Sequence, residues 1–226
     1  MLELLDKVIL SKNVVEEFYN EYKHNDKFRK WLDENIPEIR KCEEQRQDNP
    51  WHKYNVLGHI LHSVEAMNSM TNGLNYNERK MLAYTMLFHD IGKPDSHIRR
   101  RKNGRWQDSF FNHNLKSEEI AKRVLPKLNF NENECKIIEK LVLKHDIFMF
   151  IKLEKTDNPY WKQLSNDVIE EEIDDLNLVG DGFKLMKYLI WVGRSDNLAQ
   201  NEKMTGESLK MLEKFEEMLE KLANNK

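Results

Sequence analysis

Apolar residues recur at three- and four-residue spacing along most of the chain, which is the period of an amphipathic helix. Residues 56–67 show the pattern clearly, because Val56, Ile60, Val64 and Met67 fall on one helical face. Glycine and proline are scarce, with 8 and 5 residues. Runs of alternating Val, Ile and Thr bounded by hairpin turns are almost absent. The sequence therefore predicts an all-α protein folded as a helical bundle.

Changes in this pattern divide the chain into three parts. Residues 1–48 predict an N-terminal extension of two or three short helices, jointed at Pro37 and packed on the main domain. A polar break at 47–50 introduces the main domain, which we place at 49–203. Residues 204–226 predict an amphipathic helix that closes the bundle or supports a homodimer.

Capping residues indicate where helices begin inside the main domain. Asn75 or Asn77 is expected to cap one helix, and Ser117, followed by two glutamates, to cap another. Asn131 is expected to cap a third helix. Pro159 predicts the first turn of a further helix, where proline is favoured.

The composition is that of a soluble protein with a heavily charged surface, since 33% of the 226 residues are charged and 39% hydrophobic. The 36 basic and 39 acidic residues give a formal net charge of −3, which gives no overall reason to bind nucleic acid or membranes. No apolar run approaches a membrane span, and the first residues lack the pattern of a signal peptide. Cys42 and Cys135 form no CxxC motif, which predicts buried thiols in a cytoplasmic protein.

One apolar run ends at residues 87–94, LFHDIGKP, in two adjacent side chains that can both bind a metal. On a straight helix His89 and Asp90 would point about 100° apart. Gly92 and Pro94 stop the helix here, so the backbone can turn and let both side chains converge on one ion. The pair therefore predicts a site whose other ligands come from elsewhere in the chain.

Three further residues are candidate ligands, and each also has a structural interpretation. His59 adjoins an apolar helical face, where an imidazole needs a polar partner or a metal. His113 is expected in a loop that precedes a helix. Asp196 lies late in an apolar helix, where it serves either as a ligand or as the partner of Arg194.

Two other histidines extend this set. His62 lies one turn after His59, a spacing at which two side chains can share an ion, but we interpret it as a substrate-side or surface residue. His145 and Asp146 repeat the His-Asp pair at the end of another predicted helix. We include His145 among the ligands, whereas a local turn explains Asp146 equally well.

Five cationic side chains fall within residues 99–105, a segment that we expect to be a polar loop directly after Pro94. Most such runs are solvated surface. Alternatively, the segment forms a phosphate-attracting rim beside the His-Asp pair, with Arg99, Arg100 and Arg101 as the contacts. The sequence leaves both interpretations open.

The order of these residues resembles the HD-domain superfamily of metal-dependent phosphohydrolases over roughly residues 50–200. The resemblance is carried by VLGH ending at His59, LFHDIGKP around His89 and Asp90, FFNH ending at His113, LVLKH ending at His145, and RSDNLAQ around Asp196. Among HD domains, those attached to tRNA nucleotidyltransferases are the most similar, through WHKYNV at 51–56. This chain shows no nucleotidyltransferase motif, so a free-standing HD hydrolase is expected.

The resemblance implies a ligand set for one or two divalent ions. A first ion would be held by His59, His89, Asp90 and Asp196, and a second by His113 and His145 with Asp90 as the bridge. Imidazole and carboxylate ligands without thiolates suit Mn, Fe, Ni, Co, Zn or Mg. Asp90 would also orient a metal-activated water as the nucleophile. Lys93 would stabilise charge on phosphoryl oxygens, a role compatible with binding a helix C-terminus.

The expected substrate is a nucleotide or a related phosphate ester, either a monoester or a diester. His52 and His62 would line the entrance, and Arg99, Arg100 and Arg101 would bind further phosphates. RNA is left open as a partner, and no membrane is expected. Two alternatives remain: a module that binds a nucleotide or RNA end without turnover, and a di-iron oxygenase on the same scaffold, as some HD proteins are.

Overall fold

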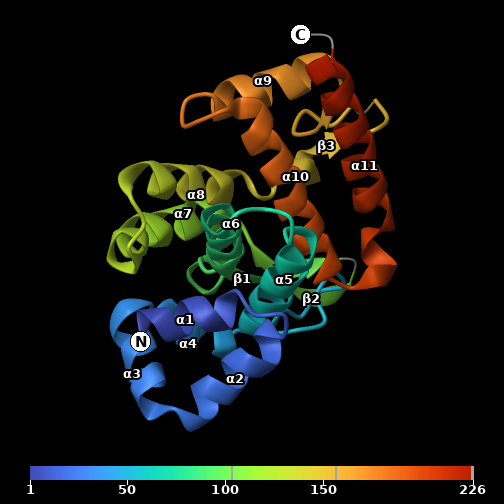
Figure 1. Ribbon diagram of the computed structural model, residues 1–226. Helices are drawn as coiled ribbons and strands as arrows, with labels where there is room; N and C mark the ends of the chain where they lie inside the picture. Colours follow the sequence, from blue (N-terminus) through green and yellow to red (C-terminus); the bar gives the residue numbers. More distant parts are fainter. Residues whose placement is uncertain (103, 156, 225–226) are drawn as a thin grey trace.

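The computed structural model describes residues 1–102, 104–155 and 157–224. These residues form the α-helices α1 Leu2–Ile9, α2 Val14–His24, α3 Asp26–Asn35, α4 Glu38–Glu44, α5 Val56–Met70, α6 Tyr76–Phe88, α7 His113–Val124, α8 Glu132–Lys144, α9 Asn166–Leu176, α10 Gly182–Leu198 and α11 Glu202–Asn224 (Figure 1). The short elements are the 3-10 helices η1 Pro94–Ser96, η2 Leu125–Leu128 and η3 Ile147–Phe150, and the strands β1 His97–Lys102, β2 Arg105–Phe110, β3 Ile151–Lys152 and β4 Lys162–Gln163. The predicted all-α class is confirmed.

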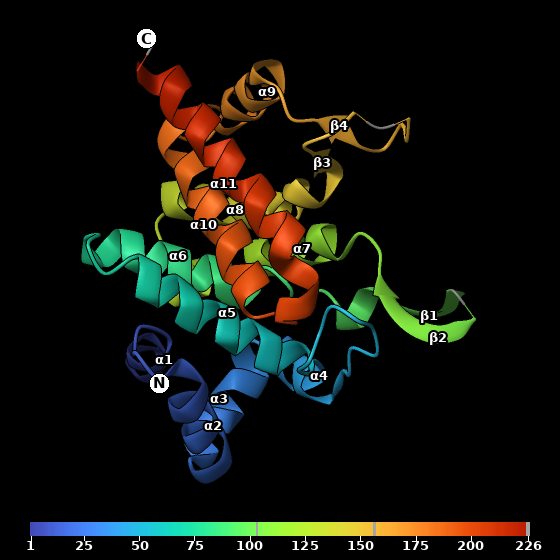
Figure 2. The same cartoon turned by 90° about the vertical axis from the view of Figure 1, so that its right-hand side faces the viewer.

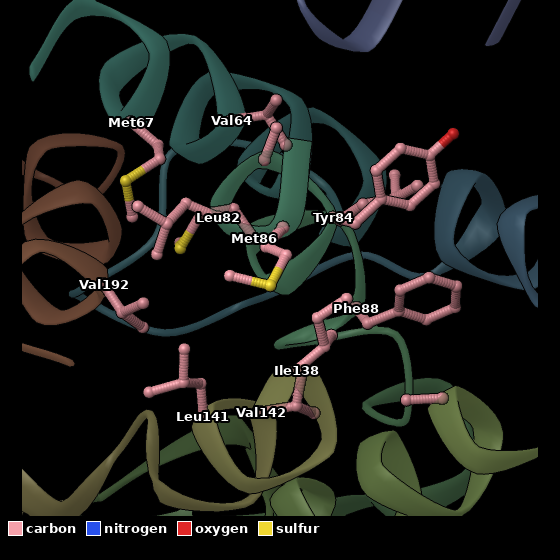
Figure 3. Packing of buried hydrophobic residues seen from close by; sticks show 14 of the residues in the cluster. Val64, Met67, Leu82, Tyr84, Met86, Phe88, Ile138, Leu141, Val142 and Val192 are labelled. Atoms are coloured by element: carbon pink, nitrogen blue, oxygen red, sulfur yellow. The ribbon is translucent and has the colours of Figure 1, made fainter. Parts of the chain in front are cut away.

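The core lies where α5, α6, α8 and α10 meet (Figure 3). Val64 of α5, Met86 of α6, Leu141 of α8 and Val192 of α10 are all fully buried and point toward one another. Helix α6 is buried along residues 81–88, as its dense apolar sequence predicts. The helix that ends in the His-Asp pair therefore runs through the middle of the molecule.

The N-terminal residues form four short helices, one more than expected, and these pack beneath α5 and α6 (Figures 1 and 2). Asn68 of α5 donates hydrogen bonds to the carbonyls of Ile9 and Ser11, at 2.8 and 2.9 Å. Lys80 of α6 forms an ion pair of 2.7 Å with Asp6. The extension is thus joined to the main domain by its apolar side, by hydrogen bonds and by charge. The domain boundaries at 48 and 203 remain predictions.

The expected polar loop after Pro94 is wrong, because these residues form an antiparallel hairpin of β1 and β2. His97 pairs with Phe110 at its base and Lys102 pairs with Arg105 at its tip. Asp108 anchors the hairpin through two hydrogen bonds to Asp48. The backbone N–H of Asp108 donates to the Asp48 carbonyl at 3.0 Å, and the Asp108 carboxylate accepts from the Asp48 N–H at 2.7 Å. This connection to a distant segment is invisible in the local pattern.

Two of the predicted helix starts are confirmed and two are wrong. Asn75 and Asn131 each form a capping box with the glutamate three residues later. Ser117 instead lies inside α7, because that helix begins at His113 after Asn112 in the left-handed conformation. Pro159 opens no helix; α9 begins later, capped by the Ser165 hydroxyl.

Cys42 and Cys135 are free, buried thiols, as expected. Among the residues that the structure describes, no helix combines the length and apolar character needed to cross a membrane.

Candidate metal centre

The His-Asp pair lies at the point where α6 ends. His89 keeps helical backbone angles as the C-cap, and the chain then turns through hydrogen bonds from Ile91 N–H to Phe88 and from Lys93 N–H to Asp90. This tight turn places both His89 and Asp90 inside the protein, where they are 0% and 1% exposed. The structure therefore shows the convergence of these two neighbouring side chains that was expected at the helix end.

Gly92 has a second role that the sequence did not reveal. A Cβ atom at this position would lie 2.5 Å from the Ser117 nitrogen and 2.7 Å from the His113 carbonyl oxygen. The Gly92 N–H also donates to the Ser117 hydroxyl at 3.0 Å. The missing side chain therefore allows the first turn of α7 to pack directly on the turn after Asp90, which brings His113 toward the pair.

The first group of candidate ligands joins helices α5, α6 and α10. His59 Nε2 lies 3.1 Å from Asp90 Oδ2 and 2.9 Å from Asp196 Oδ1. His89 Nε2 lies 3.4 Å from the same Asp90 oxygen and 3.3 Å from His59 Nε2. These four residues present one donor atom each within 4.8 Å of one another, as a metal site requires.

The second group uses the other oxygen of Asp90. His113 Nε2 and His145 Nε2 lie 3.1 and 3.6 Å from Asp90 Oδ1, and 3.0 Å from each other. Asp90 thus belongs to both groups, with Oδ2 in the first and Oδ1 in the second. All six predicted ligands are brought together in the arrangement that the resemblance implied.

Each of the four histidines is held by its other ring nitrogen. The Nδ1 atoms of His89, His113 and His145 lie 2.6, 2.8 and 2.7 Å from the carbonyl oxygen three residues earlier. His59 Nδ1 lies 3.4 Å from the Ala199 carbonyl. A carbonyl accepts only from N–H, so Nδ1 carries the proton and a neutral ring turns the Nε2 lone pair inward. Such backbone contacts leave no mark in the sequence.

Lone pairs directed at one another require a positive charge between them. Two neutral imidazoles whose Nε2 atoms are 3.0 Å apart, beside a buried carboxylate, repel unless a proton or cation intervenes. Asp90 Oδ2 is buried close to Lys93 Nζ at 2.6 Å and His59 Nε2 at 3.1 Å, but no described residue gives it a hydrogen bond of regular geometry. The donor set therefore fits divalent cations.

The titration of these groups shows the same demand for positive charge. Burial opposes the charged form of His59, but hydrogen bonds to Asp196 and Asp90 outweigh it and raise the pKa of His59. The pKa of His89 is raised in the same way, against burial, by the two carboxylates. Burial also opposes ionisation of Asp90, yet the charges of Lys93 and His89 hold its pKa well below the usual range. Without a bound cation, the two carboxylates favour the protonated form of both rings.

Lys93 and His52 lie on one side of this centre. Lys93 is buried, and its Nζ atom lies 2.6 Å from Asp90 Oδ2, 2.9 Å from Gln47 Oε1 and 3.1 Å from His52 Nε2. His52 Nδ1 contacts Asn49 Oδ1 at 2.8 Å. Burial and the neighbouring Lys93 charge lower the pKa of His52 to about 2, so His52 is neutral and accepts a hydrogen bond from the ammonium. Gln47 was not anticipated, because nothing in the break before Pro50 marks it.

The other predicted substrate contacts lie farther out. His62 stacks on Tyr54 at 4.2 Å between ring centroids and lines a surface cavity of about 220 Å³ with Glu65 and Leu198. Arg99, Arg100 and Arg101 lie on the exposed strand β1. Their role as phosphate contacts, like the roles of His52 and His62, remains a prediction.

Two alternative interpretations are settled by the geometry. Arg194 pairs with Glu216 at 2.6 Å, so it is not the partner of Asp196, whose carboxylate faces His59 and His89. Asp146 occupies the N-cap position of η3, without a capping hydrogen bond from its side chain, and belongs to neither group.

The HD domain family matches residues 56–177, more than half of the chain. The chain belongs to the HD domain family. Five of the six candidate ligands lie inside the match, and Asp196 lies beyond it. Over 126 residues the chain is also 26% identical to a bifunctional uridylyltransferase/uridylyl-removing enzyme of Cereibacter sphaeroides. That match covers 49% of this HD domain protein and only 12% of the length of the relative.

Proposed function

We propose that this HD domain protein is a metal-dependent phosphohydrolase that acts on a nucleotide or a related phosphate ester. The observation that carries the proposal is the pair of ligand groups sharing Asp90, with four inward-facing imidazole nitrogens. Divalent ions held there would supply Lewis-acid charge for phosphoryl oxygens and lower the pKa of a coordinated water.

The protein groups contribute orientation and charge. Asp90 offers one oxygen to each ligand group, so it fixes their separation and can accept a proton from a nucleophilic water. Lys93 adds a buried positive charge beside Asp90, and charge in such a water-poor setting stabilises a phosphoryl group more strongly than in bulk water. The four Nδ1 contacts to backbone carbonyls keep the rings from rotating, which preorganises the site.

The nucleotide class is proposed on two grounds. The cationic strand β1 begins next to the centre, because η1 directly follows Lys93 and leads into it. The relative is named for removing uridylyl groups, which are nucleotide-derived. Both favour a phosphorylated substrate over an uncharged one.

The test is a screen of metals against substrates. Protein stripped with a chelator is reloaded separately with Mn, Fe, Ni, Co, Zn or Mg, and assayed on p-nitrophenyl phosphate, bis-p-nitrophenyl phosphate, AMP, ATP, and 2′,3′- and 3′,5′-cyclic AMP. We expect release of phosphate or alcohol only after reloading. Nucleotide binding without turnover under every metal would support a sensing module instead. Oxygen consumption by the iron form without ester hydrolysis would support an oxygenase.

The ligand assignment has its own variant. His145→Gln should remove one of two bound ions, measured by mass spectrometry of the metal content, and lower turnover. His24→Gln changes an exposed histidine far along the chain from these ligands, and should keep both ions. Equal metal content in the two variants would contradict the second ligand group.

A further inference from the structure

The hairpin of β1 and β2 stands out from the body of the molecule as a two-stranded ribbon (Figure 2). Its base lies at the candidate metal centre. Phe110, the last residue of β2, accepts a hydrogen bond from His113 through its carbonyl, and its ring centroid is 5.5 Å from Lys93 Nζ. Strands of six residues extend about 20 Å, so the tip is that far from the centre.

The charges on this hairpin are mostly unpaired. Arg99 is held by Asp48 and Asp108 at 2.8 and 3.5 Å. The other four cations of the hairpin form no ion pair with any described carboxylate: Arg100, Arg101, Lys102 and Arg105. Their printed partners are neutral: Arg100 donates to the Ser109 hydroxyl, Arg101 to the Gly104 carbonyl, and Lys102 lies over the Trp51 ring. The chain as a whole has more acidic than basic residues, so this concentration of positive charge without acidic partners is local.

This distribution does not serve the stability of the hairpin. Lys102 and Arg105 are directly opposite one another in the register, and like charges in that position are destabilising. Arg99, Arg100 and Arg101 are consecutive, and every residue of β1 is exposed. The repulsion between these positive charges decreases when a polyanion binds along the hairpin. Release of the counterions of the polyanion favours this binding further.

Aromatic side chains accompany the cations. Trp106 on β2 is 60% exposed, opposite Arg101 in the register. Phe111, between the hairpin and His113, is 52% exposed, with the Arg100 guanidinium 4.4 Å from its ring centroid. Cations along a surface bind phosphates, and exposed rings stack on unpaired bases, which together are the means by which proteins hold single strands.

From these contacts we infer that the β1–β2 hairpin binds a single-stranded polynucleotide and leads it toward the metal centre. The four cations without a carboxylate partner contact the phosphates, Trp106 offers its face to a base, and Phe111 supports the Arg100 guanidinium beside the strand. At roughly 3.4 Å per phosphate in a stacked strand, the 20 Å hairpin spans about six phosphates. Binding stands independently; delivery of the strand to the centre rests on the proposed function.

The direct experiment measures binding in EDTA, where no turnover occurs. Fluorescence anisotropy with a 5′-labelled 12-nucleotide oligo-U, oligo-dT or matching duplex gives the affinity as salt is varied. Four phosphate contacts to a single strand predict a slope of log affinity against log salt near −2.8, from about −0.7 per contact. The triple variant Arg100→Gln, Arg101→Gln, Arg105→Gln should reduce the slope to about −0.7. Trp106→Ala should weaken either single strand at least about fivefold and the duplex much less.

The matched control removes the same charge elsewhere. Lys127→Gln, Lys187→Gln, Lys210→Gln changes three exposed lysines that form no ion pair with a described residue, and should leave both slope and affinity within twofold. Circular dichroism checks that both triple variants remain folded. Equal losses in the two triple variants, duplex bound as tightly as single strands, or phosphatidylserine vesicles bound in preference to oligonucleotides would overturn the inference.

Failure of the hairpin and failure of the proposed hydrolase are separable. Asp90→Asn should abolish turnover but keep oligonucleotide affinity in EDTA within about twofold. Turnover of small esters without oligonucleotide binding would refute only the hairpin. Oligonucleotide binding without any metal-dependent turnover would refute only the hydrolase and the delivery of the strand.

Discussion

The chain contains the pair His-Asp twice, each time at the end of a helix, and only one pair supplies two candidate ligands. His89 and Asp90 both face the centre, whereas His145 does so alone. His89 and His145 both have helical backbone angles as C-caps. After His89 the chain turns through the bond from Lys93 N–H to the Asp90 carbonyl, and Gly92 packs against α7. After His145 the chain enters η3, with Asp146 at φ −99° and ψ 7° as its cap. Identical residue pairs therefore differ through the backbone that follows them.

The difference teaches that a ligand is defined by the turn and by its environment as much as by its residue type. Asp90 is 1% exposed, and its neighbours are Lys93, four imidazole rings and the carboxylate of Asp196. Asp146 is only partly buried. A buried carboxylate must be paired or must bind a cation, whereas a partly solvated one need not.

The largest expected effect separates the two aspartates by activity. Asp90→Asn should lower turnover at least about 10³-fold, because mutating mere outer-shell partners already costs 10- to 100-fold and Asp90 is shared by both groups. Asp146→Asn, the same chemical change one helix away, should stay within about twofold. Steady-state rates on the best ester from the metal screen, with metal content measured in parallel, decide this. Similar losses in both variants would refute the distinction.

The lysines beside the two pairs should differ in stability. Lys93→Met leaves buried Asp90 without its ammonium partner, and should lower the free energy of unfolding in EDTA by about 3 kcal/mol or more. Lys144→Met breaks pairs with Glu172, whose side chain is 14% exposed, and with Asp175, which is 35% exposed and keeps Lys140. Water reaches both carboxylates more than it reaches Asp90, whose side chain is 2% exposed, so this loss should be smaller, about 1–2 kcal/mol. Urea denaturation compares them, and a larger loss at Lys144 would contradict the account.

Gly92, which follows the first His-Asp pair, is expected to affect stability and metal binding because it allows α7 to pack closely. Gly92→Ala places a Cβ atom against the backbone of α7, and should cost about 1–3 kcal/mol and displace His113. Gly73→Ala is the control, because no atom lies within 4 Å of a Cβ there. Thermal unfolding and the number of bound ions are the readouts. An unchanged ion count with Gly92→Ala would show that α7 needs no such close approach.

The smallest expected effect is a dependence of stability on pH in the metal-free protein. The raised pKa values of His59 and His89 stabilise the fold fully below about 6.5, and this contribution is lost as pH rises through the raised values. The lowered pKa values of Asp90 and Asp196 act oppositely, and their contribution is lost in acid below about pH 4. The urea concentration at the midpoint of unfolding in EDTA should therefore decrease as the pH is raised above about 6.5.

Metal should reverse the alkaline part of this dependence, because ions bind the deprotonated rings. With saturating metal the midpoint should hold or rise over the same range. A midpoint that rises with pH in EDTA would mean that the histidines carry no extra protons in the metal-free state.

Helical periodicity and the spacing of the six ligands could be read from the sequence because both depend on residue type. The hairpin could not be predicted, because a run of arginines does not favour a strand over a loop. The residue that anchors the hairpin, Asp48, is also distant in the sequence. Ser117 with its two glutamates matches the pattern of a helix start, yet it lies inside α7, where its hydroxyl accepts a hydrogen bond from the Gly92 N–H. The contacts of Lys93 with Gln47 and His52 likewise arise only from folding. Tertiary approach of backbones, rather than local preference, accounts for these misses.

The most direct measurement is anomalous X-ray diffraction from crystals of the manganese- or zinc-loaded protein, recorded at the metal absorption edge. The account predicts two peaks about 3.5–4 Å apart, one beside His59, His89 and Asp196, the other beside His113 and His145, with one Asp90 oxygen on each. Full loading with no peak between these side chains, or peaks only at surface carboxylates, would contradict it.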